Sequence, residues 1–389
     1  MRATERILRA AAALVGVVAA IPLAVMLSLL PSTPITLTGA TYLCATTLIV
    51  LGAVSAPWRQ KRHRGLIRLG LALLLIIVSI RSALPPTGAG MLLTTFPAQQ
   101  GARWLNRLFD EQDIVLVGER LAARSGGLVS AREDDQLIVA LQNAYTAMRA
   151  EDATALSPFL STALGWQQPD SFDVFVAGPR SSSSPRAGVI FLHGFGGNFA
   201  MQCWLLAHAV QRSGAITLCP SVSWHGDWWT DRGEATVRRA IDNLQQRGIE
   251  RIYLAGLSNG ALGVSRLASR LHTPLAGLIL ISGADPDAAT ASLPVLVIQG
   301  TQDERMPAAL AQRYARAAGA NGSLHLLEGD HFLLAKRADE VQKMIADWLT
   351  KQEATNANRS RPATNRARST HAPISGRIRI ACARSGEVE

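Results

Sequence analysis

The sequence predicts an α/β protein whose C-terminal half forms a doubly wound, mostly parallel sheet, preceded by three transmembrane helices and a helical connector. From about residue 172 onward, short apolar runs alternate with amphipathic segments, which is typical of parallel strands covered by helices on both faces. Before that point, long uncharged stretches reach the length needed to cross a bilayer. Hydrophobic residues make up 48% of the 389 residues and charged residues only 17%, a balance that favours some of the chain in lipid.

The net charge of +10 is concentrated at the two ends of the chain. Residues 1–84 carry +8 and residues 351–389 carry +5, so residues 85–350 carry −3. The part able to fold as a globule is therefore slightly acidic, and no nucleic-acid partner is expected.

Three apolar stretches predict three transmembrane helices. Residues 10–30 contain no charged side chain and match a hydrocarbon core of roughly 30 Å. A cleaved signal peptide is the alternative, but this stretch is longer than the usual apolar region of one and no clear cleavage site follows. The second helix is expected at 37–56 and the third at 66–84, where Arg68 and Arg81 must extend to opposite interfaces.

The distribution of cations predicts the orientation, because short loops rich in Lys and Arg stay in the cytoplasm. Arg2, Arg6 and Arg9 precede the first stretch, and residues 59–64 separate the second from the third. The loop at 31–36 is uncharged and is expected outside. We therefore expect a multi-pass protein of the cell membrane with its globular part on the periplasmic or extracellular side. If the third stretch only lies on the membrane, the same part would be cytoplasmic.

Composition divides the chain into four segments. Residues 1–84 are the membrane region, and residues 85–170 are expected to form a helical connector, interpreted as a spacer or packing layer, with a lid as the alternative. Residues 171–350 form the α/β domain. Residues 351–389 form a basic tail that is expected to be disordered, and either idle or bound to anionic lipid or cell-wall polymers.

Seven strands are expected in the α/β domain, and the sites of such sheets form where strands end. The expected strands are 172–176, 188–192, 215–219, 251–255, 276–282, 295–299 and 324–327. The fourth strand runs into Gly256-Leu257-Ser258-Asn259-Gly260 and then a helical segment. A G-x-S-x-G sequence between strand and helix predicts a sharp turn that exposes the serine hydroxyl. A tight turn with an idle serine is the structural alternative.

A second motif, His193-Gly194-Phe195-Gly196-Gly197, follows the strand 188–192. Together with the serine motif, it makes residues 172–350 resemble the α/β-hydrolase family, in which a glycine-rich loop supplies an oxyanion hole. The resemblance implies that the backbone N–H groups of Phe195 and Asn259 are the oxyanion donors. His193 itself is interpreted as structural.

The resemblance also implies an acid and a histidine after the serine, in that order. Asp303 follows the strand 295–299 and His331 follows the strand 324–327. His331 would take the proton of Ser258, and Asp303 would orient the imidazole. Glu304 or Asp285 remain alternatives for the acid.

Three tryptophans follow the strand 215–219 and are candidates for the substrate pocket: Trp224, Trp228 and Trp229. Contact with the membrane interface and plain packing are the alternatives. If the domain is exported, Cys203 and Cys219 are expected to form a disulfide. No Cys/His spacing typical of a zinc site and no phosphate-binding glycine motif occurs, so neither a metal nor a cofactor is expected.

The function expected from these features is a membrane-anchored serine hydrolase. It would cleave carboxylic esters or thioesters, of small molecules or of lipids, through an acyl-Ser258 intermediate. An acyltransferase that passes the acyl group to an envelope lipid or glycan is one alternative. A non-catalytic binding or scaffold protein on a hydrolase fold is another. The oligomeric state is not predicted.

Overall fold

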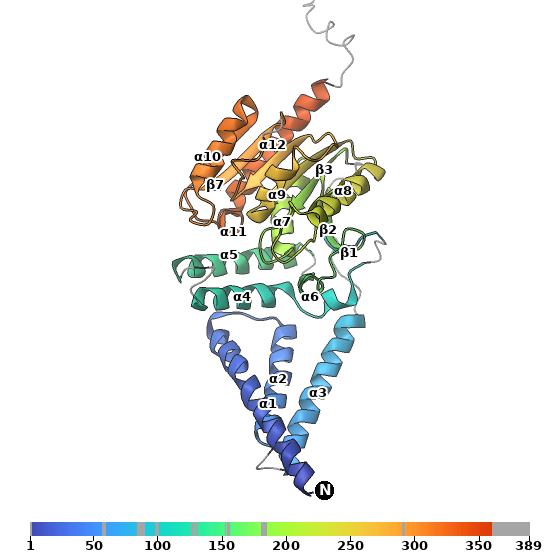
Figure 1. Cartoon of the computed structure of the whole chain (residues 1–389), viewed down its shortest axis with the longest axis vertical. Helices are drawn as coiled ribbons and strands as arrows, with labels where there is room; N and C mark the ends of the chain where they lie inside the picture. Colours follow the sequence, from blue (N-terminus) through green and yellow to red (C-terminus); the bar gives the residue numbers. More distant parts are fainter. Residues whose placement is uncertain are drawn as a thin grey trace, which may run out of the picture.

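The computed structural model describes the chain in three layers, with the N-terminal helices at one end and the sheet at the other (Figure 1). A layer formed by η2, α4, α5 and α6, called the connector layer below, lies between them. The structure describes residues 2–56, 60–83, 90–97, 101–125, 129, 131–151, 153, 156–179, 185–289 and 292–359. Residues 360–389, most of the predicted tail, lie outside the described residues.

The N-terminal layer consists of α1 (Arg2–Leu29), η1 (Leu30–Ser32), α2 (Leu37–Val54) and α3 (Gln60–Ala83). Their apolar segments, Ile7–Ser32, Leu37–Val54 and His63–Ala83, are long and apolar enough to cross a membrane. Gly70 allows α3 to pack closely on α2, because a Cβ at that position would lie 2.7 Å from the carbonyl oxygen of Ala45.

The connector layer comprises η2 (Trp104–Arg107), α4 (Glu111–Ser125), α5 (Ala131–Ala150) and α6 (Phe159–Ala163). Polar contacts join it to the N-terminal helices. The Arg81 guanidinium lies 2.8 Å from the Asp110 carboxylate, and the Thr36 hydroxyl, which caps α2, donates to Asp113 at 2.6 Å. These partly buried contacts fix the N-terminal layer against the start of α4.

The sheet has eight strands in the order β1-β2-β4-β3-β5-β6-β7-β8. Strand β2 runs antiparallel to both β1 and β4, and all other neighbours are parallel. This is the mostly parallel sheet of the α/β-hydrolase fold, as predicted. The strands are β1 (Leu92–Thr95), β2 (Asp173–Ala177), β3 (Ala187–Leu192), β4 (Ile216–Pro220), β5 (Arg251–Leu257), β6 (Gly277–Ile281), β7 (Val295–Gly300) and β8 (Gly322–Leu327).

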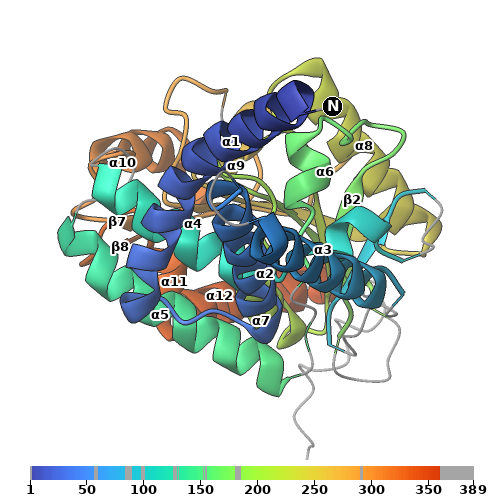
Figure 2. The same ribbon diagram turned by 90° about the horizontal axis from the view of Figure 1, so that it is seen from below.

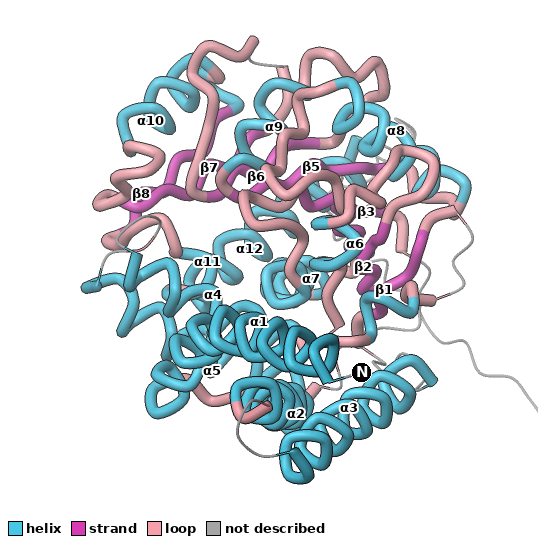
Figure 3. Tube along the Cα trace, turned by 60° about the horizontal axis from the view of Figure 1, so that its bottom comes forward, coloured by secondary structure: helices cyan, strands magenta, loops and turns pink. Residues whose placement is uncertain are grey.

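Helices cover both faces of the sheet (Figure 3). One face carries α7 (Ala200–Gln211), α11 (Leu333–Lys336) and α12 (Ala338–Arg359). The other carries α8 (Asp231–Gln246), α9 (Asn259–Leu267) and α10 (Ala308–Ala317), with η3 (Gly319–Asn321) before β8. Val189 and Phe191 of β3 face the first core, whereas Ile190 and Leu192 face the second. Burial on both faces explains the continuous apolar runs in the sequence.

The seven predicted strands are present with ends within two residues of those expected. Two expectations are corrected. The connector is not wholly helical, because Leu92–Thr95 forms the edge strand β1 and pairs with β2. The tail does not begin at residue 351, since α12 continues to Arg359. The strand β1 has only four residues, which is too short for an alternating pattern to be recognised in the sequence. The end of α12 is polar, so its sequence resembles that of the tail.

The connector layer packs against the loops at the C-terminal edge of the sheet. Glu111, at the start of α4, is fully buried, and its carboxylate accepts hydrogen bonds from the N–H groups of Ala200 (2.6 Å) and Met201 (2.9 Å) at the start of α7. The Tyr145 hydroxyl donates to the same carboxylate. Burial raises the pKa of Glu111 to about 7, against the hydrogen bonds, which favour its ionised form.

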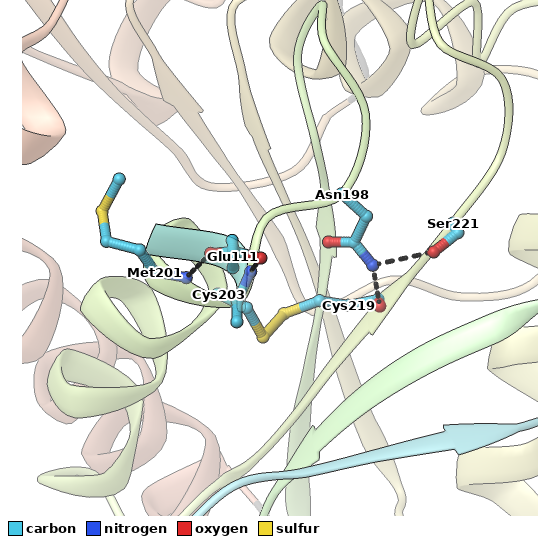
Figure 4. Close-up of a disulfide and its surroundings, with 7 residues drawn as sticks. Glu111, Asn198, Met201, Cys203, Cys219 and Ser221 are labelled. Carbon is cyan, nitrogen blue, oxygen red and sulfur yellow. Dashed lines mark hydrogen bonds between the residues drawn. A yellow bond between two sulfur atoms is a disulfide. The ribbon is translucent and has the colours of Figure 1, made fainter. Parts of the chain in front are cut away.

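The predicted disulfide is confirmed: Cys203 of α7 is bonded to Cys219 of β4. Figure 4 shows it beside the contact between Glu111 and Met201, with the Asn198 side chain donating to the carbonyl oxygen of Cys219. The start of α7 is therefore held by α4 on one side and by the neighbouring strand on the other.

We expect Glu111→Gln to lower the stability of the globular part by about 1–3 kcal/mol, because an amide has one acceptor oxygen in place of two and cannot accept from the Ala200 and Met201 N–H groups and the Tyr145 hydroxyl as the carboxylate does. The thermal unfolding midpoint, followed by tryptophan fluorescence in detergent micelles, measures the change. Asp135→Asn is the matched control, since the Asp135 side chain is 87% exposed. Equal midpoints for wild type and Glu111→Gln would show that the contact contributes nothing.

Candidate active site

Ser258 lies on the sharp turn between β5 and α9, with φ 56° and ψ −119°. This conformation is strained for a residue with a side chain, and the two flanking glycines make it possible. A Cβ on Gly260 would lie 1.9 Å from the carbonyl oxygen of Leu192, and one on Gly256 would lie 2.3 Å from that of Gly260. The hydroxyl is thereby presented at the C-terminal edge of the sheet.

His331 and Asp303 reach Ser258 from two other strand ends. The His331 Nε2 lies 2.9 Å from the Ser258 Oγ, and its Nδ1 lies 2.8 Å from the Asp303 Oδ2. Gly300 brings the two loops together, because a Cβ there would lie 2.5 Å from the carbonyl oxygen of Gly329. The structure thus brings the three residues singled out in the sequence into one chain of hydrogen bonds.

Four donors surround the buried Asp303 carboxylate. The Oδ1 accepts the N–H groups of Arg305 (3.0 Å) and Met306 (2.9 Å), and the Oδ2 accepts the Gln299 amide and the imidazole of His331. Burial by itself would raise the pKa of Asp303. The interaction with His331 and the hydrogen bonds from the other donors together lower it by more, so the pKa lies below its ordinary value. Asp303 is therefore a carboxylate at neutral pH, and its Oδ2 lies within hydrogen-bond distance of the His331 Nδ1.

The two alternative acids lie elsewhere. Glu304 is exposed, and Asp285 forms an ion pair with Arg266 at 2.5 Å. Neither carboxylate has a hydrogen bond to His331, whose Nδ1 faces Asp303.

The loop after β3 lies directly against Ser258, because a Cβ on Gly194 would be 3.1 Å from the Ser258 Cβ. In the part of the chain that the structure describes, the backbone N–H groups of Phe195 and Asn259 have no hydrogen-bond partner. The next N–H, that of Gly196, donates to the Trp224 carbonyl oxygen. The two residues expected at an oxyanion hole thus have donors available to a ligand.

His193 is a structural residue in this arrangement. Its Nδ1 donates to the Gly194 carbonyl oxygen at 2.8 Å, and its Nε2 accepts the Val222 N–H at 3.3 Å, which requires a neutral ring. Full burial lowers the pKa of His193 to about 4. The ring thus links the loop after β3 to Val222, which lies just after β4.

The three tryptophans have three different environments. The structure corrects the prediction for Trp228, which is fully buried and donates its indole N–H to the His193 carbonyl oxygen. Trp229 stacks under the Arg266 guanidinium at 4.6 Å. Trp224 lies at the site, with its ring 6.2 Å from that of Phe195 and 5.1 Å from that of Phe159 in α6.

Sequence reasoning missed two contributions to the site. Gln299 donates to the Asp303 Oδ2 and to the Met306 carbonyl oxygen, both at 2.8 Å, and so shapes the acid loop. Its signal in the sequence is a polar residue at the end of an apolar strand. The second is the connector layer, since Glu133 of α5 pairs with Arg305 at 2.8 Å and α6 contacts Trp224. No local sequence pattern predicts the pairing of Glu133 with Arg305 or the contact of α6 with Trp224.

Among the described residues, no group of three His, Cys, Asp or Glu side chains could hold a metal ion.

No protein-family model matches the chain, and no curated protein matches it. Solved structures are similar to somewhat less than half of the chain. Est1E from Butyrivibrio proteoclasticus is 17% identical over 47% of this chain and 95% of its own, with a TM-score of 0.42. An alpha-beta serine hydrolase homologue from Coxiella burnetii is 18% identical over 46% and 91%, with a TM-score of 0.37. TT1662 from Thermus thermophilus is 18% identical over 47% and 95%, with a TM-score of 0.38.

We expect His193 to make stability depend on pH. Its pKa is about 4 in the folded protein and about 6.5 when unfolded, so the unfolded state binds the extra proton between these values. The stability that the neutral ring provides, about 3 kcal/mol, is fully present above pH 6.5 and is lost as the pH falls toward 4.

The measurement compares unfolding midpoints of wild type and His193→Gln between pH 4 and 7. Glu111 titrates in the same range with the opposite sign but is common to both proteins, so the difference between them isolates His193. The advantage of wild type over the variant should grow with pH. A constant difference would contradict the assignment.

Proposed function

We propose that the protein is a membrane-anchored serine hydrolase that cleaves carboxylic esters or thioesters through an acyl-Ser258 intermediate. The observation that carries the proposal is the chain of hydrogen bonds from Ser258 through His331 to Asp303, next to the two unpartnered N–H groups of Phe195 and Asn259. This is the arrangement that nucleophilic catalysis by a serine requires. Three helices able to cross a membrane support the anchoring.

In the acylation step, the Ser258 Oγ attacks the carbonyl carbon of the substrate while the His331 Nε2 accepts the hydroxyl proton. The carbonyl oxygen becomes an oxyanion and accepts hydrogen bonds from the two N–H groups. The imidazolium is stabilised by the Asp303 carboxylate, which stays ionised because its pKa is lowered. When the bond to the leaving group breaks, His331 donates its proton to the leaving oxygen or sulfur.

In the deacylation step, a water molecule takes the place of the leaving group. His331 accepts one proton of the water as its oxygen attacks the acyl carbon, and a second tetrahedral oxyanion forms at the same donors. Collapse of this intermediate breaks the bond to the Ser258 Oγ, which regains a proton from His331. The products are a carboxylic acid and the alcohol or thiol released earlier.

We expect Ser258→Ala to lower the turnover of p-nitrophenyl esters by about 10³- to 10⁶-fold, because the nucleophile is lost while the fold is kept. A fluorophosphonate probe should label wild type and leave Ser258→Ala unlabelled. Ser213→Ala is the matched control, since this hydroxyl donates only to the Val210 carbonyl oxygen in the last turn of α7. If the probe fails to label wild type, a non-catalytic binding or scaffold role is favoured instead.

We expect Asp303→Asn to lower turnover by about 10⁴-fold, since an amide favours the wrong tautomer of His331 and cannot balance its positive charge. Glu304→Gln neutralises the adjacent, exposed carboxylate and should leave turnover within about twofold. Initial rates with one p-nitrophenyl ester compare the two variants. A larger loss in Glu304→Gln than in Asp303→Asn would reassign the acid.

Product analysis with a candidate acceptor decides between hydrolysis and acyl transfer. A hydrolase releases the free acid at an unchanged rate when an envelope lipid or glycan is added. Appearance of the acylated acceptor at the expense of the acid would make the protein an acyltransferase with the same triad.

A further inference from the structure

Large apolar side chains remain exposed beside the candidate site. Trp104 of η2 is 54% exposed, Leu164 and Trp166 just after α6 are 57% and 43% exposed, and Phe195 of the oxyanion loop is 43% exposed. Large apolar residues exposed in one region mark a surface that contacts an apolar partner.

These side chains connect with the nucleophile through a row of aromatic rings. Gly194 lies against Ser258, and the next residue, Phe195, has its ring 6.2 Å from that of Trp224. The Trp224 ring is 5.1 Å from that of Phe159, the first residue of α6. Gly197 also approaches α6, since a Cβ there would be 3.9 Å from the Thr162 Cγ2. On this side, α6 thus borders the candidate site.

Residues of η2 and the segment after α6 also connect to the end of α3. The Arg81 side chain donates to the Arg107 carbonyl oxygen at 2.7 Å, and Arg107 donates to that of Ser82 at 3.3 Å. Arg103 donates to the Trp166 carbonyl oxygen at 3.0 Å, which ties Trp166 to the start of η2. η2 contacts both α3 and α6. In Figure 1, α6 lies in the layer next to the end of α3, and Figure 2 shows both helices from the side of the N-terminal helices.

A buried carboxylate fixes α6 in this place. Asp173 of β2 is fully buried and accepts hydrogen bonds from the Ser161 hydroxyl (2.6 Å) and the Gln167 amide (2.8 Å), with the Arg103 guanidinium 3.3 Å away. Charged hydrogen bonds in a buried setting are strong. The segment from α6 to Trp166 is therefore held in place beside the candidate site.

From this arrangement we infer that the substrate is a long-chain acyl ester of a membrane lipid, which reaches Ser258 directly from the bilayer along α6. The inference rests on the proposed function and on insertion of α1–α3 in a membrane. The exposed apolar side chains continue the surface at the end of α3, where tryptophans favour the interface between lipid and water. The acyl chain then passes from lipid to Phe159, Trp224 and Phe195 without crossing water.

The test uses the full chain reconstituted in vesicles of phosphatidylethanolamine and phosphatidylglycerol, with release of fatty acid as one readout and hydrolysis of soluble p-nitrophenyl acetate as the other. Wild type should hydrolyse both. Leu164→Asp and Trp166→Asp should each lower the ratio of the vesicle rate to the soluble rate at least tenfold. Leu326→Asp is the matched control, because Leu326 on β8 is 40% exposed and distant in the fold from α6.

The outcomes separate the inference from the function on which it rests. Hydrolysis of p-nitrophenyl acetate without release of fatty acid from vesicles would overturn the lipid substrate and leave the serine hydrolase intact. An unchanged ratio in both aspartate variants would overturn the route along α6. A protein that hydrolyses neither ester would overturn the proposed function itself.

Discussion

The close approach of backbone at the turn after β5 is the constraint on which the site depends. Gly260 lies so near the end of β3 that a Cβ would overlap the Leu192 carbonyl oxygen, and this contact joins the serine turn to the strand that carries the oxyanion loop. Ser258 must then adopt a positive φ, which directs its hydroxyl out of the sheet. The strain is balanced by the two buried cores that hold the strands in register. The serine turn and the loop after β3, which carry the proposed nucleophile and the proposed oxyanion donors, thus meet at one packing contact.

The connector layer packs against the loops that form the candidate site. It touches three separate loops at the C-terminal edge of the sheet, through Glu111 at the start of α7, Glu133 at the acid loop and Phe159 at Trp224. Its opposite side is bonded to the ends of α2 and α3. The connector layer therefore contacts both the N-terminal helices and the loops of the candidate site.

Strong local patterns made much of the fold and the three central residues predictable. Buried parallel strands require apolar runs, and the serine turn requires glycines at 256 and 260, so both leave a signature in the sequence. Glu111 contacts residues 89 and 90 positions away, and no periodicity records such a contact. Trp228 and Trp224 were indistinguishable in sequence, because packing under Gly263 and His193 decides which ring is buried. The edge strand β1 is not predicted, because four residues are too few to show the alternation of a strand.

The central claim is that Ser258 is the residue that carries the acyl group. Mass spectrometry of protein quenched with acid during turnover of a slowly hydrolysed ester tests it most directly. The account predicts an added mass equal to the acyl group on the peptide that contains Ser258, formed in wild type and lost as substrate is exhausted. An acyl group found on a different residue would contradict this claim. It would also be contradicted if the released alcohol shows a burst and no acylated protein is found.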